Sequence, residues 1–385
     1  MTYINSNIHY YGWYRVQQAI DTIDTNIKII NFVDIYFLNY NVEVIEEPWI
    51  GIIHHTSCSF STNNIISLFK NNVFLNSLKY CKHLISLSYY NKQNITFEIN
   101  SIYTNIPVLV LKHPQPPNPS NRLFNLKLFE ESLNVFNIGG WLRNPYTIYH
   151  CDIKYNDILL NKNKLKGNAM EQYFPNDGFD LSTIVNKIVL NKGEIEKYTA
   201  NIDNIFQYSH PSNSSNYYIK YLIEYIKYLI NGYEKKNEKY SDIDILNKLI
   251  SNHNSVKLVS YMSNADYLNM LVSSIVFCDY IDCSASNTIL ECISTATPII
   301  LNRHPAILEY LGYNYALYFD NIYDASTNTY VLTSEQVQLA HTQLLEIRKN
   351  SDIELSNFIH SIKLLCEKIS GLDNKRKNKY FFFLK

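Results

Sequence analysis

Short apolar runs that end in polar loops dominate the first part of the chain. Such runs are typical of strands that are buried on both faces of a parallel sheet. Two stretches between them, residues 16–23 and 65–78, carry apolar residues at helical spacing. This alternation of strand and helix predicts a doubly wound α/β sheet. The predicted strands cover residues 27–32, 49–53, 83–88 and 106–111.

The same alternation returns in the second part of the chain. A strand is predicted at residues 135–138, and the order strand, helix, strand follows at 256–262, 266–271 and 275–279. Parallel strands arranged in this way bring their carboxyl ends to one crevice, which is where ligands of open α/β sheets bind. Residues 334–368 are predicted to form long helices.

A proline-rich stretch separates the two parts. Four prolines fall within residues 112–120, which disfavours a helix or a central strand and favours an extended connector. The length of 385 residues also fits two domains of about 100–200 residues each. We therefore predict an N-terminal domain at 1–133, a second domain at 134–354 and a final segment at 355–385. Within the second domain, the amphipathic stretch 218–230 is predicted to be a surface helix.

Composition and charge narrow the classes of partner. The chain has 34 Lys and Arg against 35 Asp and Glu, which argues against broad electrostatic binding of nucleic acid. Its seven cysteines form no C-x-x-C pair, so neither a metal site nor a disulfide framework is predicted. No run approaches the ~18 apolar residues of a membrane span, and the first residues do not resemble a signal peptide. We therefore expect a soluble, cytoplasmic protein that binds small molecules or glycans.

The basic and aromatic tail, residues 375–385, has two interpretations. It could contact a membrane surface, since basic and aromatic residues together suit the headgroup region. A frayed or self-packed terminus is the favoured interpretation, because chain ends are commonly poorly ordered. Membrane contact is therefore not part of the predicted function.

The segment 283–302 carries the most functional information. Its sequence predicts a strand end, a polar loop, a helix, a proline stop at Pro298 and a new strand at 299–301. Ser284 to Thr288 supply small polar side chains and backbone N–H groups at the start of the helix. The positive end of a helix dipole and its unpaired N–H groups suit a phosphate.

This segment, continued by residues 303–312, resembles the donor-binding half of GT-B-fold glycosyltransferases, especially glycosyltransferase family 4 and its relatives. The resemblance is strong over about residues 256–320, moderate over about 106–175, and weak elsewhere. It implies two Rossmann-like domains that face a central cleft, with the final helix crossing back so that 355–370 pack on the N-terminal domain. It also implies a nucleotide-sugar co-substrate and no metal or other cofactor.

The resemblance implies that the donor contacts residues 139–170 and 256–312. A leaving diphosphate needs fixed positive potential. Arg143, directly after the Gly139-Gly140 turn, can grip two phosphate oxygens, and Lys166 can add a point charge. A surface ion pair is the alternative role for Arg143. The candidate donor-binding residues are Gly140, Arg143, Lys166, Tyr261, Ser284, Ser286, Asn287, Thr288, Glu291 and Glu309.

Glu291 has two candidate roles. With Thr288 three residues earlier it forms a capping-box sequence, in which the glutamate would bond the start of its own helix. The resemblance instead implies that Glu291 bonds the donor's ribose hydroxyls, and this is the favoured role. The family often places a further glutamate where this chain has Cys283, with Asp282 one residue earlier. That departure leaves the stereochemistry open, with retention preferred.

His54 and His55 end the predicted strand 49–53 on the side expected to bind the acceptor, between residues 9–15 and 50–60. Adjacent side chains on an extended chain point to opposite faces, so at most one of the two can face the cleft. That histidine could orient a sugar or accept a proton. A packing role is the alternative. Gly12 and Trp13 could form a glycine turn on the same side.

The favoured function is that of a metal-independent glycosyltransferase. It would move a sugar from a nucleotide-sugar to a hydroxyl of a glycan, protein or lipid, with His54, His55 and Glu291 as the candidate catalytic residues. A catalytically silent glycan- or nucleotide-binding protein of the same fold is the alternative, which Cys283 and the few basic residues motivate. Another chemistry on this fold, such as sugar epimerisation, is a third possibility.

Overall fold

The computed structural model describes most of the first part of the chain and a smaller share of the second. Four short segments, 158–159, 165–168, 256–259 and 372–382, are described by their backbone alone. Several residues considered in the sequence analysis lie outside the described part: Gly140, Tyr261, the side chain of Lys166 and the stretch 218–230. The described residues are 12–57, 64–102, 105–118, 121–138, 142–143, 153–156, 158–159, 165–168, 256–259, 262–280, 282–319 and 330–382.

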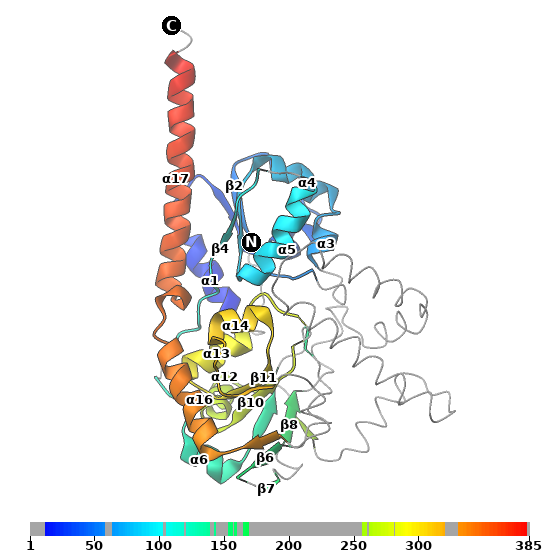
Figure 1. Ribbon diagram of the computed structural model, residues 1–385. Helices are drawn as coiled ribbons and strands as arrows, with labels where there is room; N and C mark the ends of the chain where they lie inside the picture. The colour runs from blue at the N-terminus through cyan, green and yellow to red at the C-terminus, as the bar shows by residue number, and fades with distance from the viewer. Residues whose placement is uncertain are drawn as a thin grey trace, which may run out of the picture.

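The first part of the chain forms a four-stranded parallel sheet (Figure 1). Its strands follow the order of the sequence, as expected when each helical crossover moves one position along the sheet. All four predicted strands are confirmed, with ends shifted by at most two residues. They are β1 (Lys28–Ile30), β2 (Trp49–Ile53), β3 (Cys81–Ser86) and β4 (Val108–Val110).

Side-chain alternation on β2 sorts the core of this sheet into two layers. Ile50 and Ile52 pack against α1 (Gly12–Asp21) and α17 (Leu355–Phe382). Trp49 and Ile53 pack on the opposite face, against the crossover helices. These helices are α2 (Val33–Asn39), α3 (Ile65–Leu68), α4 (Asn72–Ser77) and α5 (Tyr89–Asn100), with a 3₁₀ turn, η1, at Leu78–Tyr80.

The single helix predicted at 65–78 is wrong in one respect, because the chain forms α3 and α4 there. Asn71 interrupts the helix: its side chain accepts a hydrogen bond from the Phe74 amide at 3.0 Å and so caps a new helix start. The Asn71 side-chain amide also donates to the carbonyl of Phe37 in α2. A tertiary contact thus holds the break in place.

The second part forms a six-stranded parallel sheet in the order β12-β11-β10-β5-β8-β9. The chain enters at β5 in the middle, moves outward through β8 to β9, and returns to β10 on the other side of β5. The direction of winding therefore reverses between β5 and β10, and crevices at such points bind ligands. The strands are β5 (Val135–Asn137), β8 (Leu165–Asn168), β9 (Val256–Val259), β10 (Ile275–Cys278), β11 (Ile299–Asn302) and β12 (Tyr318–Phe319).

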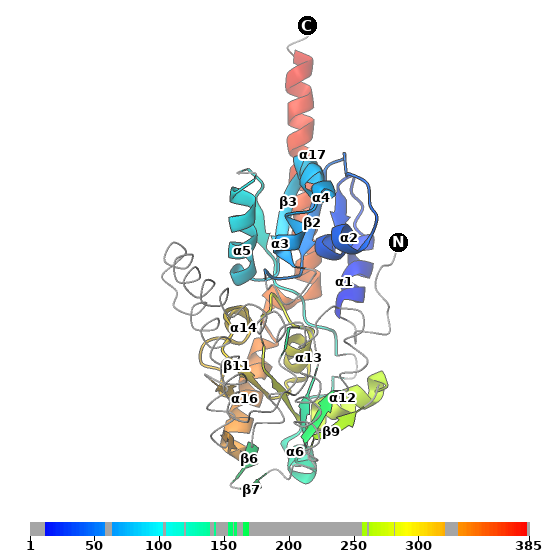
Figure 2. The ribbon, with the colours of Figure 1, turned by 90° about the vertical axis from the view of Figure 1, so that its right-hand side faces the viewer.

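Helices on both faces cover this second sheet, and a small three-stranded sheet lies beside it (Figures 1 and 2). The sequence analysis did not predict the small sheet, which pairs segments almost 180 residues apart. The helices are α6 (Leu126–Ser132), α12 (Asn264–Ser273), α13 (Asn287–Thr295), α14 (Pro305–Leu311) and α16 (Ser334–Ile347). The small sheet contains β6 (Ile153–Tyr155), β7 (Ile158–Leu159) and β13 (Tyr330–Leu332), and a 3₁₀ turn, η4 (Ser351–Ile353), precedes α17.

Helix α17 returns from the second part of the chain to the first sheet. Phe358, Ile362 and Ile369 lie in one hydrophobic cluster with Val16 of α1 and Ile50 of β2. Figures 1 and 2 show the helix running along the first domain and extending beyond it. Two Rossmann-like domains joined in this way form the GT-B architecture expected from the sequence. Within the described residues, no helix combines the length and apolar composition needed to cross a bilayer.

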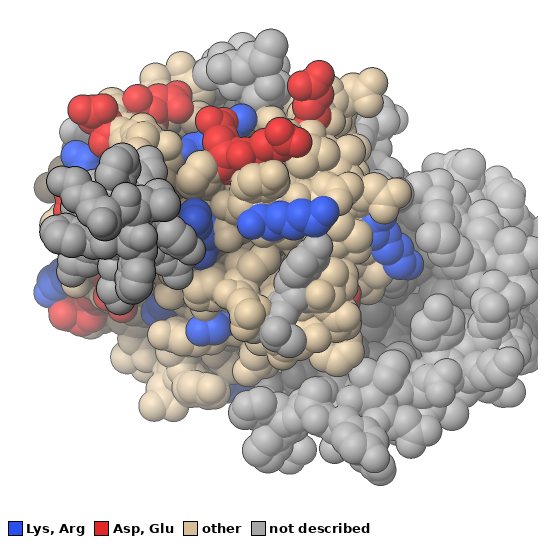
Figure 3. Space-filling model, turned by 90° about the horizontal axis from the view of Figure 1, so that it is seen from above, with Lys and Arg blue, Asp and Glu red and all other residues tan. Residues whose placement is uncertain are grey.

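Charged residues are mixed by sign on the described surface seen from above. Figure 3 shows Lys and Arg side chains lying among Asp and Glu and among uncharged residues. The near balance of 34 basic and 35 acidic residues gives the same picture for the whole sequence.

Candidate functional site

Arg143 and Ser286 meet at the point where the second sheet reverses its winding. Arg143 follows β5, and Ser286 is the N-cap of α13, which follows β10. The guanidinium Nη2 donates to the Ser286 hydroxyl at 3.0 Å, and Nη1 donates to the carbonyl of Ile138. A planar cation therefore lies beside the positive end of a nine-residue helix.

Arg143 is buried rather than paired at the surface. It is 9% exposed and its guanidinium carbon lies 4.9 Å from the centre of the Tyr280 ring. Its Nε has no hydrogen-bond partner among the described residues. The alternative role as a surface ion pair is therefore wrong, since a buried cation held by neutral groups retains its capacity to bind an anion.

A hydrogen-bonded frame holds the loop between β10 and α13. The Asn302 side chain accepts from the Tyr280 backbone N–H and donates to the Tyr280 carbonyl, both at 2.8 Å. The Tyr280 hydroxyl lies 2.6 Å from the Ser286 hydroxyl. These contacts fix the backbone before the helix start and keep Ser286 close to Arg143.

The helix start differs from the predicted one. Ser286, not Thr288, caps α13, and its hydroxyl accepts from the Ile289 amide. Glu291 therefore lies in the second turn, beyond the third helical position that a capping box uses. The capping-box interpretation of Thr288 and Glu291 is wrong, and Thr288 is buried in the first turn.

Glu291 instead points to Tyr267 of α12. The Tyr267 hydroxyl donates to Glu291 Oε2 at 2.6 Å, and Glu291 is 7% exposed. Burial raises the pKa of Glu291 to about 7, against the lowering effects of the Tyr267 hydrogen bond and of Arg143. The carboxyl group is therefore poised between its two protonation states near neutral pH.

The first domain touches the helix start directly. A Cβ atom placed on Gly12 would lie 2.8 Å from Asn287 Oδ1, so the lack of a side chain at Gly12 lets the start of α1 lie directly against the Asn287 side chain. Gly12 opens α1 rather than forming the predicted turn. The Ser284 hydroxyl donates to the carbonyl of His54, which joins the loop before α13 to the end of β2.

The carboxyl edges of the two sheets therefore face each other at the predicted site. Residues of both domains lie at this boundary. The second domain contributes Ser284, Ser286, Asn287 and Arg143, and the first domain contributes the backbone of His54 and Gly12. In this conformation Ser284 is 1% exposed and bonded across the boundary. A ligand that used its hydroxyl would have to break that hydrogen bond.

Glu309 also joins the domains. Its two carboxylate oxygens accept the backbone amides of Tyr89 and Tyr90, each at 2.7 Å, at the first turn of α5. The Lys112 ammonium group donates to the Glu309 carbonyl at 2.8 Å. Burial raises the pKa of Glu309, and the bonds to Tyr89 and Tyr90 lower it. This predicted donor ligand thus caps a helix of the other domain.

His54 and His55 have different neighbours. The His54 ring packs among aromatic rings, with its centre 3.9 Å from Phe32 and 3.7 Å from Trp13. Burial lowers the pKa of His54 well below its usual value, and His113 and His55 lower it further. This environment favours a neutral packing histidine.

His55 lies beside a buried carboxylate that the sequence analysis missed. Asp34, at the start of α2, is fully buried and accepts the His54 backbone amide at 2.8 Å. Its second oxygen lies 3.5 Å from His55 Nδ1. The signal for Asp34 was present in the sequence, since it follows a strand's carboxyl end, but its pairing with a residue on the next strand was not visible.

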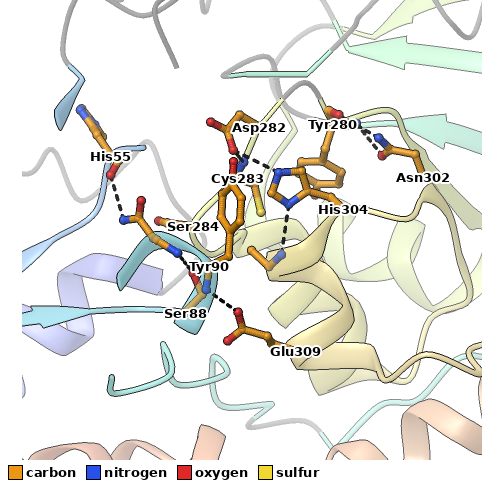
Figure 4. Close-up of polar contacts among 12 residues, drawn as sticks. His55, Ser88, Tyr90, Tyr280, Asp282, Cys283, Ser284, Asn302, His304 and Glu309 are labelled. Atoms are coloured by element: carbon orange, nitrogen blue, oxygen red, sulfur yellow. Dashed lines mark hydrogen bonds and ion pairs between the residues drawn. The ribbon is translucent and has the colours of Figure 1, made fainter. Parts of the chain in front are cut away.

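A second histidine and carboxylate pair was also missed. His304 Nε2 lies 3.0 Å from Asp282 Oδ1, and Oδ1 also accepts the Cys283 amide at 2.8 Å (Figure 4). The side chain of Cys283 is buried, which raises the pKa of its thiol. Asp282 and not Cys283 is therefore the acidic group of this loop.

The remaining candidates lie partly outside the described residues. Gly140 and Tyr261 are not described, and Lys166 is placed only by its backbone, in β8 between β5 and β9. Among the side chains that the structure does describe, no three or more His, Cys, Asp or Glu residues form a group that could hold a metal ion.

Comparisons with known proteins give structural similarities at low sequence identity. No protein-family model matches the chain, and a search of curated proteins found no match. The α,α-trehalose-6-phosphate synthase of Burkholderia multivorans is similar with a TM-score of 0.48 and 9% identity, covering 94% of this chain and 74% of that one. The Anabaena protein HepE, solved with UDP-glucose, has a TM-score of 0.44 and 10% identity, covering 93% and 81%.

The N-terminal domain of the Candida albicans trehalose-6-phosphate phosphatase is similar with a TM-score of 0.46 and 10% identity. The similar region covers 92% of this chain and 72% of that one. The function of this chain is therefore inferred below from its own residues and topology.

Proposed function

We propose that this protein is a glycosyltransferase that moves a sugar from a nucleotide-sugar to an acceptor hydroxyl. One observation carries the proposal: Arg143 donates a hydrogen bond to Ser286, the N-cap of α13. The two residues lie beside the neighbouring strands β5 and β10, where the winding of the sheet reverses, a position that we call the β5–β10 switch point. That point lies against the first domain, as the approach of Gly12 to Asn287 shows. An anion site between two Rossmann-like domains suits a donor on one side and an acceptor on the other.

Arg143 and α13 supply what the leaving nucleoside diphosphate needs. Negative charge grows on the phosphate as the bond to the sugar carbon breaks. The guanidinium and the positive end of the α13 dipole can stabilise that charge without a metal ion. Ser286 and Asn287, at the helix start, are assigned to the phosphates, and we propose that the reaction requires no metal.

Glu291 is assigned to the ribose hydroxyls of the donor. A carboxylate accepts hydrogen bonds from two adjacent hydroxyls, and the Tyr267 hydroxyl at 2.6 Å holds one oxygen in place. Glu291 lies in the second turn of α13, on the same helix whose start is assigned to the diphosphate. The buried setting strengthens these hydrogen bonds, because few water molecules compete for them.

On the acceptor side, His55 is better placed than His54 to contact substrate. The His55 side chain is 14% exposed, with Nδ1 3.5 Å from Asp34 Oδ2, whereas His54 is packed among Trp13 and Phe32. We propose that His55 orients the acceptor and that the product retains the donor's configuration. An inverted product would instead identify His55, supported by Asp34, as the base that removes the acceptor proton. The acceptor is a hydroxyl of a glycan, protein or lipid.

The test is direct. The full-length protein is incubated with uridine, guanosine and adenosine diphosphate sugars, and binding and nucleoside diphosphate release are measured with and without acceptors. Binding of one nucleotide class with release of its diphosphate is expected. No binding at millimolar donor would contradict the proposal. Donor binding without hydrolysis or transfer, unchanged in Glu291→Gln, would establish the catalytically silent alternative.

A further inference from the structure

Asp282 and His304 form a buried pair beside the proposed donor site. Asp282 lies in the loop between β10 and α13, two residues before Ser284, and His304 is the N-cap of α14. Asp282 is 7% exposed and His304 is fully buried. Their side chains point toward each other in Figure 4, with Nε2 and Oδ1 3.0 Å apart. The pair thus connects the donor loop to the following helix.

The helix cap fixes the tautomer of His304. The Ala306 backbone N–H donates to His304 Nδ1 at 3.2 Å, so Nδ1 carries the lone pair of a neutral ring. Nε2 then carries the hydrogen and donates it to Asp282 Oδ1. One ring nitrogen therefore caps the start of α14, while the other orients the Asp282 carboxylate.

The hydrogen bonds that Asp282 accepts from described residues use only one of its two oxygens. Oδ1 accepts two hydrogen bonds, from Cys283 N–H and from His304, whereas Oδ2 has none within the described residues. A carboxylate next to the anion site repels phosphate oxygens. Its complement is therefore a hydrogen-bond donor, and the sugar hydroxyls of the donor substrate are the nearest neutral donors to the diphosphate.

Contacts from the first domain support this pair. The Tyr90 ring, at the start of α5, packs edge-on against His304 with ring centres 4.8 Å apart. The Tyr90 backbone amide is held by Glu309 Oε1 at 2.7 Å, one turn further along α14 than His304. Both oxygens of Glu309 are used in this way, because Oε2 accepts the Tyr89 amide. The contact exists only when the two domains are closed together.

We propose that His304 is a positioning residue that aims Asp282 at a hydroxyl of the transferred sugar, and that Glu309 and Tyr90 make this alignment depend on domain closure. The inference rests on the proposed function. When the domains close, the Tyr90 ring packs against the His304 ring and fixes its position. The hydrogen bond from His304 then fixes the orientation of the Asp282 carboxylate. Glu309 accordingly acts as a clamp between the domains and does not contact the donor.

His304→Asn separates the two functions of the histidine. Asparagine is a good N-cap, so α14 keeps its start, but its shorter amide cannot reach Asp282. We expect the melting temperature and the affinity for the nucleoside diphosphate to stay near those of the unchanged protein. We expect affinity for the nucleotide-sugar to fall by about tenfold, because the carboxylate loses its orientation. Glu346→Gln, which removes an exposed carboxylate of α16, is the matched control.

The double variant decides whether the two residues act as one unit. Asp282→Asn with His304→Asn should lower nucleotide-sugar affinity no further than Asp282→Asn alone. Additive losses, or equal losses for nucleotide-sugar and nucleoside diphosphate, would overturn the inference while leaving the proposed function in place. If the unchanged protein binds neither the uridine, guanosine nor adenosine diphosphate sugars, the proposed function falls and this inference falls with it.

Closure is tested at Glu309 and Tyr90. Glu309→Gln leaves only one acceptor oxygen for two amides, and Tyr90→Leu removes the ring but keeps the backbone amide. Both variants should lower kcat by about tenfold with smaller changes in nucleoside diphosphate affinity, and Glu309→Gln should enlarge the radius of gyration seen by small-angle scattering. Unchanged kcat in both variants would overturn the role assigned to closure.

Discussion

The Arg143 guanidinium donates to the hydroxyl of Ser286 at 3.0 Å, and this hydrogen bond joins the chain after β5 to the N-cap of α13. The two residues are separated by 143 positions in the sequence. They meet because β5 and β10 are neighbours in the second sheet, at the place where its winding reverses. A cation and a helix start are thereby combined in one anion site.

Arg143→Lys should weaken this site while the fold stays intact. Lysine keeps the charge but cannot make the forked contacts with Ser286 and two phosphate oxygens. Affinity for the nucleoside diphosphate, measured by titration calorimetry, should fall by about tenfold or more. Arg122→Lys is the control, since Arg122 is exposed and bonds only Asn269 and nearby groups. Equal effects of the two changes would count against the anion site.

Stability should respond to pH through Glu291. Burial raises the pKa of Glu291 to about 7 in the folded protein, whereas an unfolded glutamate titrates near about 4.3. The folded state therefore binds more protons between these values, and stability falls as the pH rises through this window. Glu291→Gln removes a cost of at most about 4 kcal/mol that is fully present only above pH ~7.

The free energy of unfolding of the unchanged protein and of Glu291→Gln is measured by urea denaturation at about pH 5 and about pH 8. Glu291→Gln keeps an acceptor for the Tyr267 hydroxyl, so its advantage over the unchanged protein should be larger at the higher pH. Glu346→Gln, at an exposed position, should show no such trend. A Glu291→Gln advantage that shrinks with rising pH would refute the buried, proton-retaining state.

Gly51 in β2 tests the packing of the first domain. A Cβ atom there would lie 2.3 Å from Val33 Cγ2 and 2.6 Å from Trp49 Cζ3, so Gly51→Ala should destabilise the protein by about 1–3 kcal/mol. Val33→Ala in the same chain should recover part of the loss. Gly371→Ala is the control, because nothing lies within 4 Å of that position in α17. It should be neutral or stabilise by about 0.5–1 kcal/mol.

The attachment of α17 to the first domain is tested by two residues of that helix. Ile362 is fully buried against the first sheet, so Ile362→Ala should cost about 2–5 kcal/mol. Leu364, two positions later, is 50% exposed, and Leu364→Ala should change stability by less than about 0.5 kcal/mol. Similar costs for the two changes in a denaturant melt would contradict the observed packing.

Much of the fold was predictable, because continuous apolar runs such as 49–53 and 275–279 carry their own strand signal. Helix α2 was missed since Val33 follows β1 without a turn signal, so the apolar run shows no boundary. Strand β8 was missed because Lys166 and Gly167 lack the apolar character of a central strand. Its position is set by pairing with β5 and β9 on either side.

The candidate site was predictable only where one short segment contains it. Ser284 to Glu291 form a loop and helix start that the local sequence encodes, and the placement of that helix start was wrong by two residues. The pairs Asp34 with His55 and Asp282 with His304 depend on neighbouring strands and on helix docking. Residues about twenty positions apart give no local signal of such contacts.

The most direct test of the account is a crystal structure of the full chain with its bound nucleotide-sugar. The account predicts that the diphosphate lies against Arg143 and the first backbone amides of α13, with Glu291 at the ribose hydroxyls and Asp282 at the transferred sugar. A diphosphate bound away from the β5–β10 switch point, or one that Arg143 does not touch, would contradict it.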